Sequence, residues 1–174
     1  MGKSHPNKNT PTPVKLRFPI PPLPEPFESD FRAFLALVWQ HLNLPRPTPI
    51  QLDIALYMQN GPDRQVDEAF RGVGKSWIAS AFVVWCLRKW PWLKFLVVSA
   101  SKERADNFTT FTLRLIHEIP ILQCLRPTAD QRNSKISFDV GPALADHAPS
   151  VTSKGITGQL AGSRANIIIS DDEH

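Results

Sequence analysis

The sequence predicts an α/β fold with a mostly parallel sheet. Two short apolar runs, at 95–98 and 166–170, have the composition of parallel strands that are covered on both faces. Before and between them lie segments in which apolar residues recur at helical spacing. The segment 75–89 is apolar on every side, as buried helices are. Strands that alternate with helices favour parallel pairing.

The other predicted helices are defined by apolar spacing and by capping residues. The first is expected to begin at an N-cap, Ser29, and to end before Pro45. A short helix is expected at 50–59, because the turn sequence 60–62 follows it. Ser101 is expected to cap a later helix. The expected core-facing residues are Phe31, Phe34, Leu35, Val38 and Leu42 in the first helix, and Ala105, Phe108, Phe111 and Leu115 in the later one.

Five strands are expected, at 64–70, 95–98, 135–140, 151–156 and 166–170. The first leads into a loop that contains two glycines. The third and fourth are expected to pair with each other. The last is expected to be a buried strand, and acidic residues follow it.

The chain divides into three predicted segments. Residues 1–27 contain eight of the 17 prolines, which fix their own backbone angle and supply no amide donor, so an extended arm is expected. This arm is either a solvated tail or a segment that binds a partner or DNA. Residues 28–62 are expected to be helical, and residues 63–174 to form the α/β core.

Charge gives no evidence that the predicted core binds nucleic acid. The chain has a formal charge of +4, and residues 1–24 hold four basic and no acidic residues. The rest holds 16 basic and 16 acidic residues, so its formal charge is zero. The excess charge belongs to the arm, and its position matters more than its size.

Apolar runs and cysteines argue against three further classes of protein: membrane-spanning, secreted, and metal- or disulfide-based proteins. The longest apolar run, 77–87, is about half of the roughly 20 residues that cross a bilayer, so no membrane span is expected. The first residues lack the apolar stretch of a secretory signal, which predicts a cytosolic location. Cys86 and Cys124 have no metal-site spacing, and both are expected to be reduced core residues.

A phosphate-binding loop is the main functional motif. Residues 69–76 read AFRGVGKS, which matches the pattern G-x-x-x-x-G-K-S/T except at its first glycine. The second glycine lets the backbone approach the phosphates, the lysine contacts the β and γ oxygens, and the serine gives its hydroxyl group to magnesium. The helix that follows points its N-terminal amides at the anion. The residues expected to bind ATP and Mg²⁺ here are Gly72, Val73, Gly74, Lys75 and Ser76.

An acidic cluster follows the last predicted strand. A phosphate loop needs an acidic residue at the end of a strand to hold magnesium, and a base to activate the attacking water. Asp171 directly follows the strand and is expected on the metal side, with Asp172 or Glu173 as the base. Three consecutive acids leave this division of roles open.

Several stretches of the chain resemble the large terminase subunit of short-tailed bacteriophages. They are the phosphate-loop stretch 69–77, VVSASKERAD at 97–106, ISFDVGP at 136–142 and GITGQLAGSRA at 155–165. The similarity runs from about residue 47 to the end, in order and nearly without gaps. It implies a P-loop NTPase of the additional-strand, catalytic-glutamate type, with a sheet that is truncated at the C-terminal end of this chain.

The resemblance also implies roles for single residues. Lys75 and Ser76 match the family's loop lysine and hydroxyl group. Arg71 matches an arginine four residues before that lysine, where it would either reach the γ-phosphate or pair with an acid. Gln51 matches a glutamine that reads adenine through its amide. Arg164 lies where some relatives place an arginine that reaches into the neighbouring subunit's site.

For the whole protein, the resemblance implies the ATPase motor of a viral genome-packaging machine, which hydrolyses ATP to move double-stranded DNA into a procapsid. The expected partners are DNA, the portal protein of the procapsid, the small terminase subunit and further copies of the chain in a ring, with no membrane. The expected location is the host cytoplasm, transiently at the portal. A nuclease domain is expected in the complete protein and is absent from these residues.

Two other interpretations stay open. The run Asp172, Glu173 and His174 also fits the acidic motif of a superfamily 2-like helicase, which the ordered similarity to terminases disfavours. Alternatively, the chain is an inactive fragment, because its sheet is incomplete.

Overall fold

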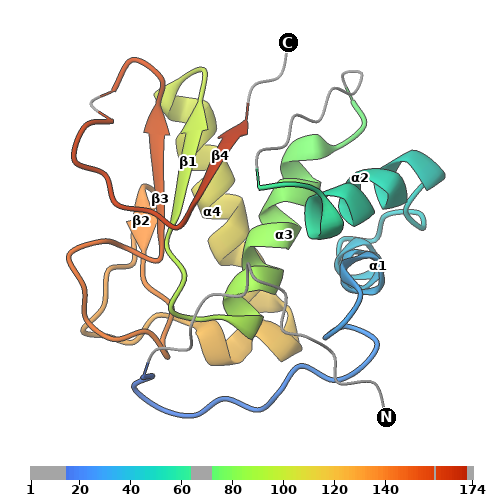
Figure 1. Cartoon of the computed structure of the whole chain (residues 1–174), viewed down its shortest axis with the longest axis horizontal. Helices are drawn as coiled ribbons and strands as arrows, with labels where there is room; N and C mark the ends of the chain where they lie inside the picture. The colour runs from blue at the N-terminus through green and yellow to red at the C-terminus, as the bar shows by residue number, and fades with distance from the viewer. Residues whose placement is uncertain (1–14, 64–71, 159, 172–174) are drawn as a thin grey trace.

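The computed structural model describes residues 15–63, 72–158 and 160–171. Within these ranges the chain folds into one four-stranded sheet with helices packed against it (Figure 1). The elements are α1 (Phe31–His41), α2 (Pro49–Asn60), α3 (Lys75–Lys89), β1 (Phe95–Ser99), α4 (Lys102–Glu118), the 3₁₀ helix η1 (Pro120–Leu125), β2 (Ser137–Phe138), β3 (Val151–Gly155) and β4 (Ile167–Asp171).

The sheet is mixed but mostly parallel. Its strand order is β2-β3-β1-β4, and β1 pairs in parallel with β3 on one side and with β4 on the other. Phe95 is in register with both Val151 and Ile167. The short strand β2 pairs antiparallel with β3 at the edge. The predicted α/β class with a mostly parallel sheet is therefore confirmed.

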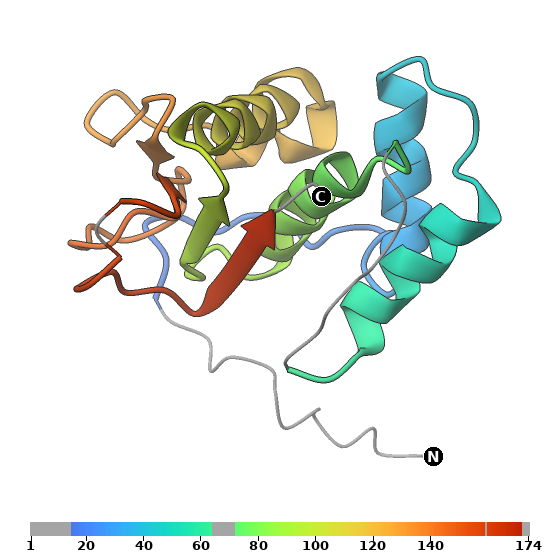
Figure 2. The ribbon, with the colours of Figure 1, turned by 90° about the horizontal axis from the view of Figure 1, so that it is seen from above.

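Helices α3 and α4 lie on one face of the sheet, and α1 and α2 lie beyond α3 (Figure 2). Successive side chains of a strand point to opposite faces of the sheet, which explains this one-sided packing. In β4, Ile167 and Ile169 pack against the core, whereas Ile168 points the other way and is 66% exposed. Within the described residues, the sheet therefore has one face covered by helices and one partly open.

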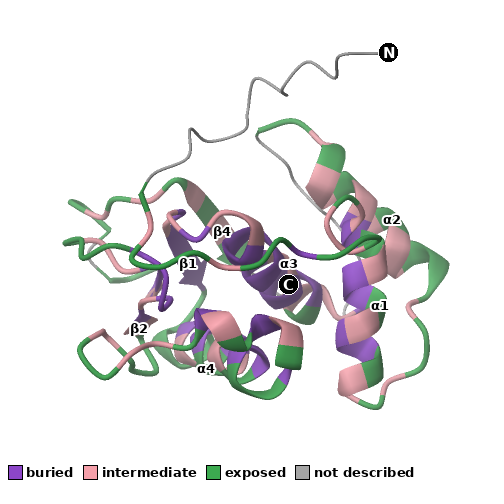
Figure 3. Ribbon diagram, turned by 90° about the horizontal axis from the view of Figure 1, so that it is seen from below, coloured by how far each residue is buried: buried purple, intermediate pink, exposed green. Residues whose placement is uncertain are grey.

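Helix α3 is the centre of the core. Ten of its 15 residues are buried, and Figure 3 shows buried positions around most of its surface. The Phe31 ring of α1 lies 5.3 Å from both Phe82 and Trp85 of α3. The predicted bounds 75–89 and the prediction that this helix is buried are both confirmed.

Residues 15–27 run across the base of the domain without helix or strand, and a turn begins at Glu25 (Figure 1). Leu23 is buried in the core, and the Trp85 indole donates to the Phe27 carbonyl oxygen at 2.8 Å. The guanidinium group of Arg88, which is 4% exposed, donates to the carbonyl oxygens of Pro21 at 2.7 Å and Ile121 at 2.9 Å. These contacts fasten this part of the chain to the C-terminal end of α3.

Arg88→Met is expected to destabilise the fold by roughly 2–4 kcal/mol, because methionine retains the apolar stem but leaves two carbonyl groups without their donor. Urea unfolding of the chain measures the free energy. Arg114→Met, at an exposed position of α4, is the matched control and should change it by less than about 0.5 kcal/mol. Equal effects of the two substitutions would show that the Arg88 contacts contribute nothing specific.

Three local predictions are wrong. The N-cap of α1 is Asp30, whose carboxylate accepts from the Arg32 amide at 3.0 Å, whereas the Ser29 hydroxyl group donates to Glu25. Helix α2 begins one residue early, at Pro49, because Thr48 caps it. Cys86 is a buried free thiol, as predicted, but Cys124 is only half-buried. Burial raises the pKa of the thiol groups of both.

Two strands also differ from their predictions. The strand predicted at 135–140 is limited to Ser137 and Phe138, because the backbone amides that follow donate hydrogen bonds to groups outside the sheet. The Asp139 amide donates to the Arg132 carbonyl oxygen, and the Val140 amide donates to the Ser150 hydroxyl oxygen. Strand β4 is half-exposed instead of buried, because it lies at an edge of the described sheet with one face uncovered. The strand predicted at 64–70 lies outside the described residues.

Candidate functional site

The described part of the predicted phosphate loop is a glycine turn that leads directly into α3. Gly72 and Gly74 have φ angles of 90° and 83°, a region that glycine adopts without the strain that other residues carry. Gly74 is the N-cap of α3, and within the described part of the chain no side-chain hydrogen bond caps this end of the helix. Among the described side chains, none accepts from the first amides of α3, at the end where the helix dipole favours an anion.

Ser76 and Asp171 meet at this end of α3. The Ser76 hydroxyl group donates to the Asp171 carboxylate, with distances of 2.7 Å to Oδ1 and 2.9 Å to Oδ2. Asp171 is the last residue of β4, and Ser76 lies in the first turn of α3. The structure therefore brings together the two residues predicted from distant parts of the sequence to bind magnesium. Their role as metal ligands stays a prediction.

The carboxyl ends of three parallel strands converge beside this contact. Ser99 is in register with both Gly155 and Asp171. Its side chain is fully buried, and its hydroxyl group has no hydrogen-bond partner within the described part of the chain. The burial of Ser99 at this sheet edge was not predictable, because a serine at the end of a strand has no sequence signature of its own.

Gln51 contacts the glycine turn of the predicted phosphate loop. Its Nε2 donates to the Val73 carbonyl oxygen at 2.9 Å, and its Oε1 accepts from the Thr48 amide at 3.0 Å and from the Trp39 indole at 3.2 Å. The contact with Thr48 belongs to the capping box of α2. The resemblance placed Gln51 at the nucleotide, and the structure places it at the loop that precedes α3.

The remaining predicted residues are not part of this arrangement. Arg71, Asp172 and Glu173 lie outside the described residues. Arg164 is exposed and lines a cleft of about 870 Å³ beside β3, together with Lys102, Arg132 and Lys154. Neither Ser76 nor Asp171 lines this cleft.

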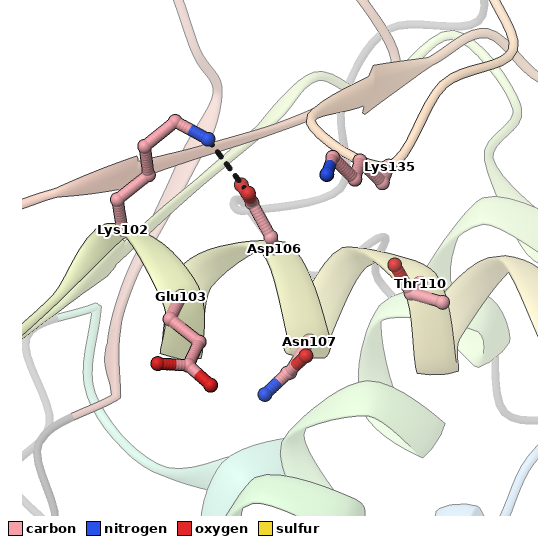
Figure 4. Close-up of a pocket in the computed structure, with 6 residues that line it drawn as sticks. All are labelled: Lys102, Glu103, Asp106, Asn107, Thr110 and Lys135. Atoms are coloured by element: carbon pink, nitrogen blue, oxygen red, sulfur yellow. Dashed lines mark hydrogen bonds and ion pairs between the residues drawn. The ribbon is translucent and has the colours of Figure 1, made fainter.

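A smaller hollow of about 410 Å³ lies at the N-terminal end of α4 (Figure 4). Figure 4 shows Lys102 and Asp106 joined by an ion pair of 2.7 Å, with Lys135 facing them from the loop before β2. Lys102 contacts only Oδ2 of Asp106, and neither Lys75 nor Ser76 lines the hollow. We assign no chemistry to it.

Two features are absent from the described part of the chain. Within the ranges 15–63, 72–158 and 160–171, no three His, Cys, Asp or Glu side chains cluster as a metal site would require. In the same ranges, no helix is both long and apolar enough to cross a membrane.

No protein-family model matches the chain. The large terminase subunit of Enterobacteria phage T3 is 56% identical to it over 146 residues, which are 83% of this chain and 25% of that protein. The chain is a homologue of a phage terminase large subunit. It spans about a quarter of the length of this relative.

The homology confirms the family that the sequence motifs indicated, and it favours a terminase over a helicase. It does not test the roles of single residues. The P-loop type of the fold also stays a prediction, because residues 64–71 lie outside the described part of the terminase homologue.

Proposed function

We propose that this chain binds and hydrolyses ATP for a terminase that packages double-stranded phage DNA. One observation carries the proposal: the Ser76 hydroxyl group and the Asp171 carboxylate touch at the uncapped N-terminus of α3. Hydroxyl and carboxylate oxygens are ligands that Mg²⁺ accepts, and a helix N-terminus after a glycine turn suits a phosphate group. The homology to a terminase large subunit supports the DNA-packaging role.

The residues present fit a magnesium–ATP complex. Ser76 and Asp171 would hold the ion, Asp171 directly or through water. When bound, Mg²⁺ neutralises charge that develops on the phosphates during transfer. Lys75 follows the glycine turn and would place its ammonium group on the β and γ oxygens. The amides of α3 would donate to the same phosphates without a reorganisation cost, because the helix already fixes their direction.

Three further roles are part of the proposal. Arg71 would stabilise charge on the γ-phosphate from within the same subunit. Asp172 or Glu173 would orient and deprotonate the attacking water. Arg164 would act on the site of a neighbouring subunit in a ring, and its exposure at the cleft beside β3 is compatible with that role.

The proposed partners follow from the family. They are double-stranded DNA, the portal protein of a procapsid, a small terminase subunit and further copies of the chain. The proposed place of action is the host cytoplasm, at the procapsid portal. A nuclease activity would belong to parts of the protein that these residues do not include.

Calorimetric titration of the chain with ATP, with and without Mg²⁺, tests the proposal. We expect ATP to bind and Mg²⁺ to raise its affinity. We expect inorganic tripolyphosphate to bind as well, because the loop recognises phosphates. A chain that is folded by circular dichroism but binds neither ligand would overturn the nucleotide-binding assignment.

Ser76→Ala is expected to weaken ATP binding in the presence of Mg²⁺ by roughly tenfold or more, because one charge-assisted contact is lost. Binding without Mg²⁺ should change little. Ser80→Ala is the matched control one turn along α3, where the buried hydroxyl group has no partner among the described residues. The metal role of Ser76 would be refuted if both variants kept the wild-type response to Mg²⁺.

A further inference from the structure

The amide group of Gln51 joins three parts of the molecule. Its oxygen accepts from the Trp39 indole of α1 and from the Thr48 amide at the start of α2. Its nitrogen donates to the carbonyl oxygen of Val73 in the phosphate loop. One half-buried side chain thus connects both N-terminal helices to the loop across 22 residues of sequence.

The acceptor of this bond is the centre of the glycine turn. Val73 lies between Gly72 and Gly74, the two positions with left-handed backbone angles. Glycines lose more conformational freedom on folding than other residues, so a turn of this kind needs contacts from outside to stay in one geometry. Val73 is held in two ways. It is buried, with 4% of its surface exposed, and its carbonyl oxygen accepts a hydrogen bond from the Gln51 amide.

Gln51 is itself held from the opposite side. Trp39 is 3% exposed, and its ring lies edge-on to Trp77, 6.4 Å away, in the first turn of α3. The indole N–H and the Thr48 amide together occupy both acceptor positions of the Gln51 oxygen. Reading adenine requires a glutamine that both accepts from and donates to the base edge. The oxygen that would accept from the base already accepts two hydrogen bonds, from Trp39 and from Thr48.

We propose that Gln51 is a positioning residue that fixes the phosphate loop through the Val73 carbonyl group, and that it does not read the base. The proposal rests on the proposed function of the loop as a nucleotide site. It makes α1 and α2 part of the binding machinery, since Trp39 and Thr48 orient the amide that holds the loop. It also predicts that the contribution of Gln51 is the same for any ligand that carries the phosphates.

Gln51→Glu separates this role from helix capping. A glutamate at this position keeps an oxygen for Thr48 and for Trp39, and it is the other residue that completes a capping box. It has no N–H for Val73, so only the loop contact is lost. Calorimetry with ATP and with inorganic tripolyphosphate, both with Mg²⁺, should show a loss of roughly three- to tenfold for each ligand, by the same factor.

Two further variants make the result specific. Gln51→Met is neutral and must weaken both ligands equally as well, which excludes repulsion by the glutamate charge as the cause. Gln59→Glu is the matched control on the same helix: the Gln59 amide donates to the Ser29 carbonyl oxygen at 2.8 Å, away from the loop. It should leave both affinities unchanged, and circular dichroism should show all the variants folded.

The outcomes are distinct. Equal losses for ATP and tripolyphosphate in both Gln51 variants would support the positioning role. A loss for ATP alone would show that Gln51 reads adenine and would overturn the inference, as would unchanged binding of both ligands. If the wild-type chain binds neither ligand, the proposed function fails, and this inference fails with it.

Discussion

Lys75→Ala is expected to reduce ATP hydrolysis by the complete terminase at least about 1000-fold, and with it the packaging of DNA into procapsids. The lysine follows the left-handed Gly74 in the first turn of α3, where an ammonium group can reach the phosphates. The amides of α3 bring only partial charge to this end of the helix, so they cannot replace a full positive charge. Single-turnover hydrolysis and a nuclease-protection assay of packaged DNA measure the two effects.

Lys135→Ala is the matched control for this substitution. Lys135 is an exposed lysine beside the hollow at α4, so its loss should change hydrolysis less than twofold (Figure 4). The Lys75 variant should remain folded, because a half-exposed side chain at a helix start contributes little to the core. Normal packaging by folded Lys75→Ala would remove the motor assignment altogether.

The parts of the site that were predictable depend on order along the chain. Parallel strands end at the same edge of a sheet, and a helix that follows a glycine turn begins where the turn ends. Because of these two rules, the sequence alone predicts that Ser76 and Asp171 act at one site. The second rule also places the start of α3, which begins at Lys75 directly after the glycine turn.

The parts that were not predictable depend on neighbours that are distant in sequence. From the sequence alone Gln51 is a surface residue of a helix, and the resemblance to terminases makes it a reader of adenine; neither indicates its part in the capping box of α2. Only the proximity of Trp39 and Val73 shows which groups its amide contacts. Ser99 is a similar case, since its burial depends on the elements that cover the sheet edge.

The N-terminal segment illustrates a further limit of composition. Its prolines predict extended chain; residues 15–27 contain no helix or strand, but a turn begins at Glu25. Composition does not indicate what an extended segment contacts. Leu23 enters the core and the Pro21 carbonyl oxygen accepts from the buried Arg88, and neither contact has a periodic pattern in the sequence.

Trp85→Ala is expected to cost roughly 3–5 kcal/mol of the free energy of unfolding, which is enough to unfold a marginally stable domain. Trp85 is 3% exposed on α3, and its ring lies 5.3 Å from Phe31 and 6.4 Å from Trp90. Its indole also donates to the Phe27 carbonyl oxygen. The substitution would therefore leave a cavity and an unpaired carbonyl group at the point where α1, α3 and the N-terminal segment meet.

Trp77→Ala distinguishes packing at this point from the general loss of a tryptophan. Trp77 lies on the same helix, stacks on Phe111 at 5.8 Å and is 41% exposed, so we expect its loss to cost less than half as much. Chemical unfolding followed by circular dichroism compares the two variants. Ser76 lies in the first turn of α3, so Trp85→Ala should also weaken ATP binding, in proportion to the fraction of unfolded protein. The affinity for tripolyphosphate should fall by the same factor. Equal costs for the two tryptophans would show that the contacts of Trp85 with α1 and the N-terminal segment contribute nothing specific to stability.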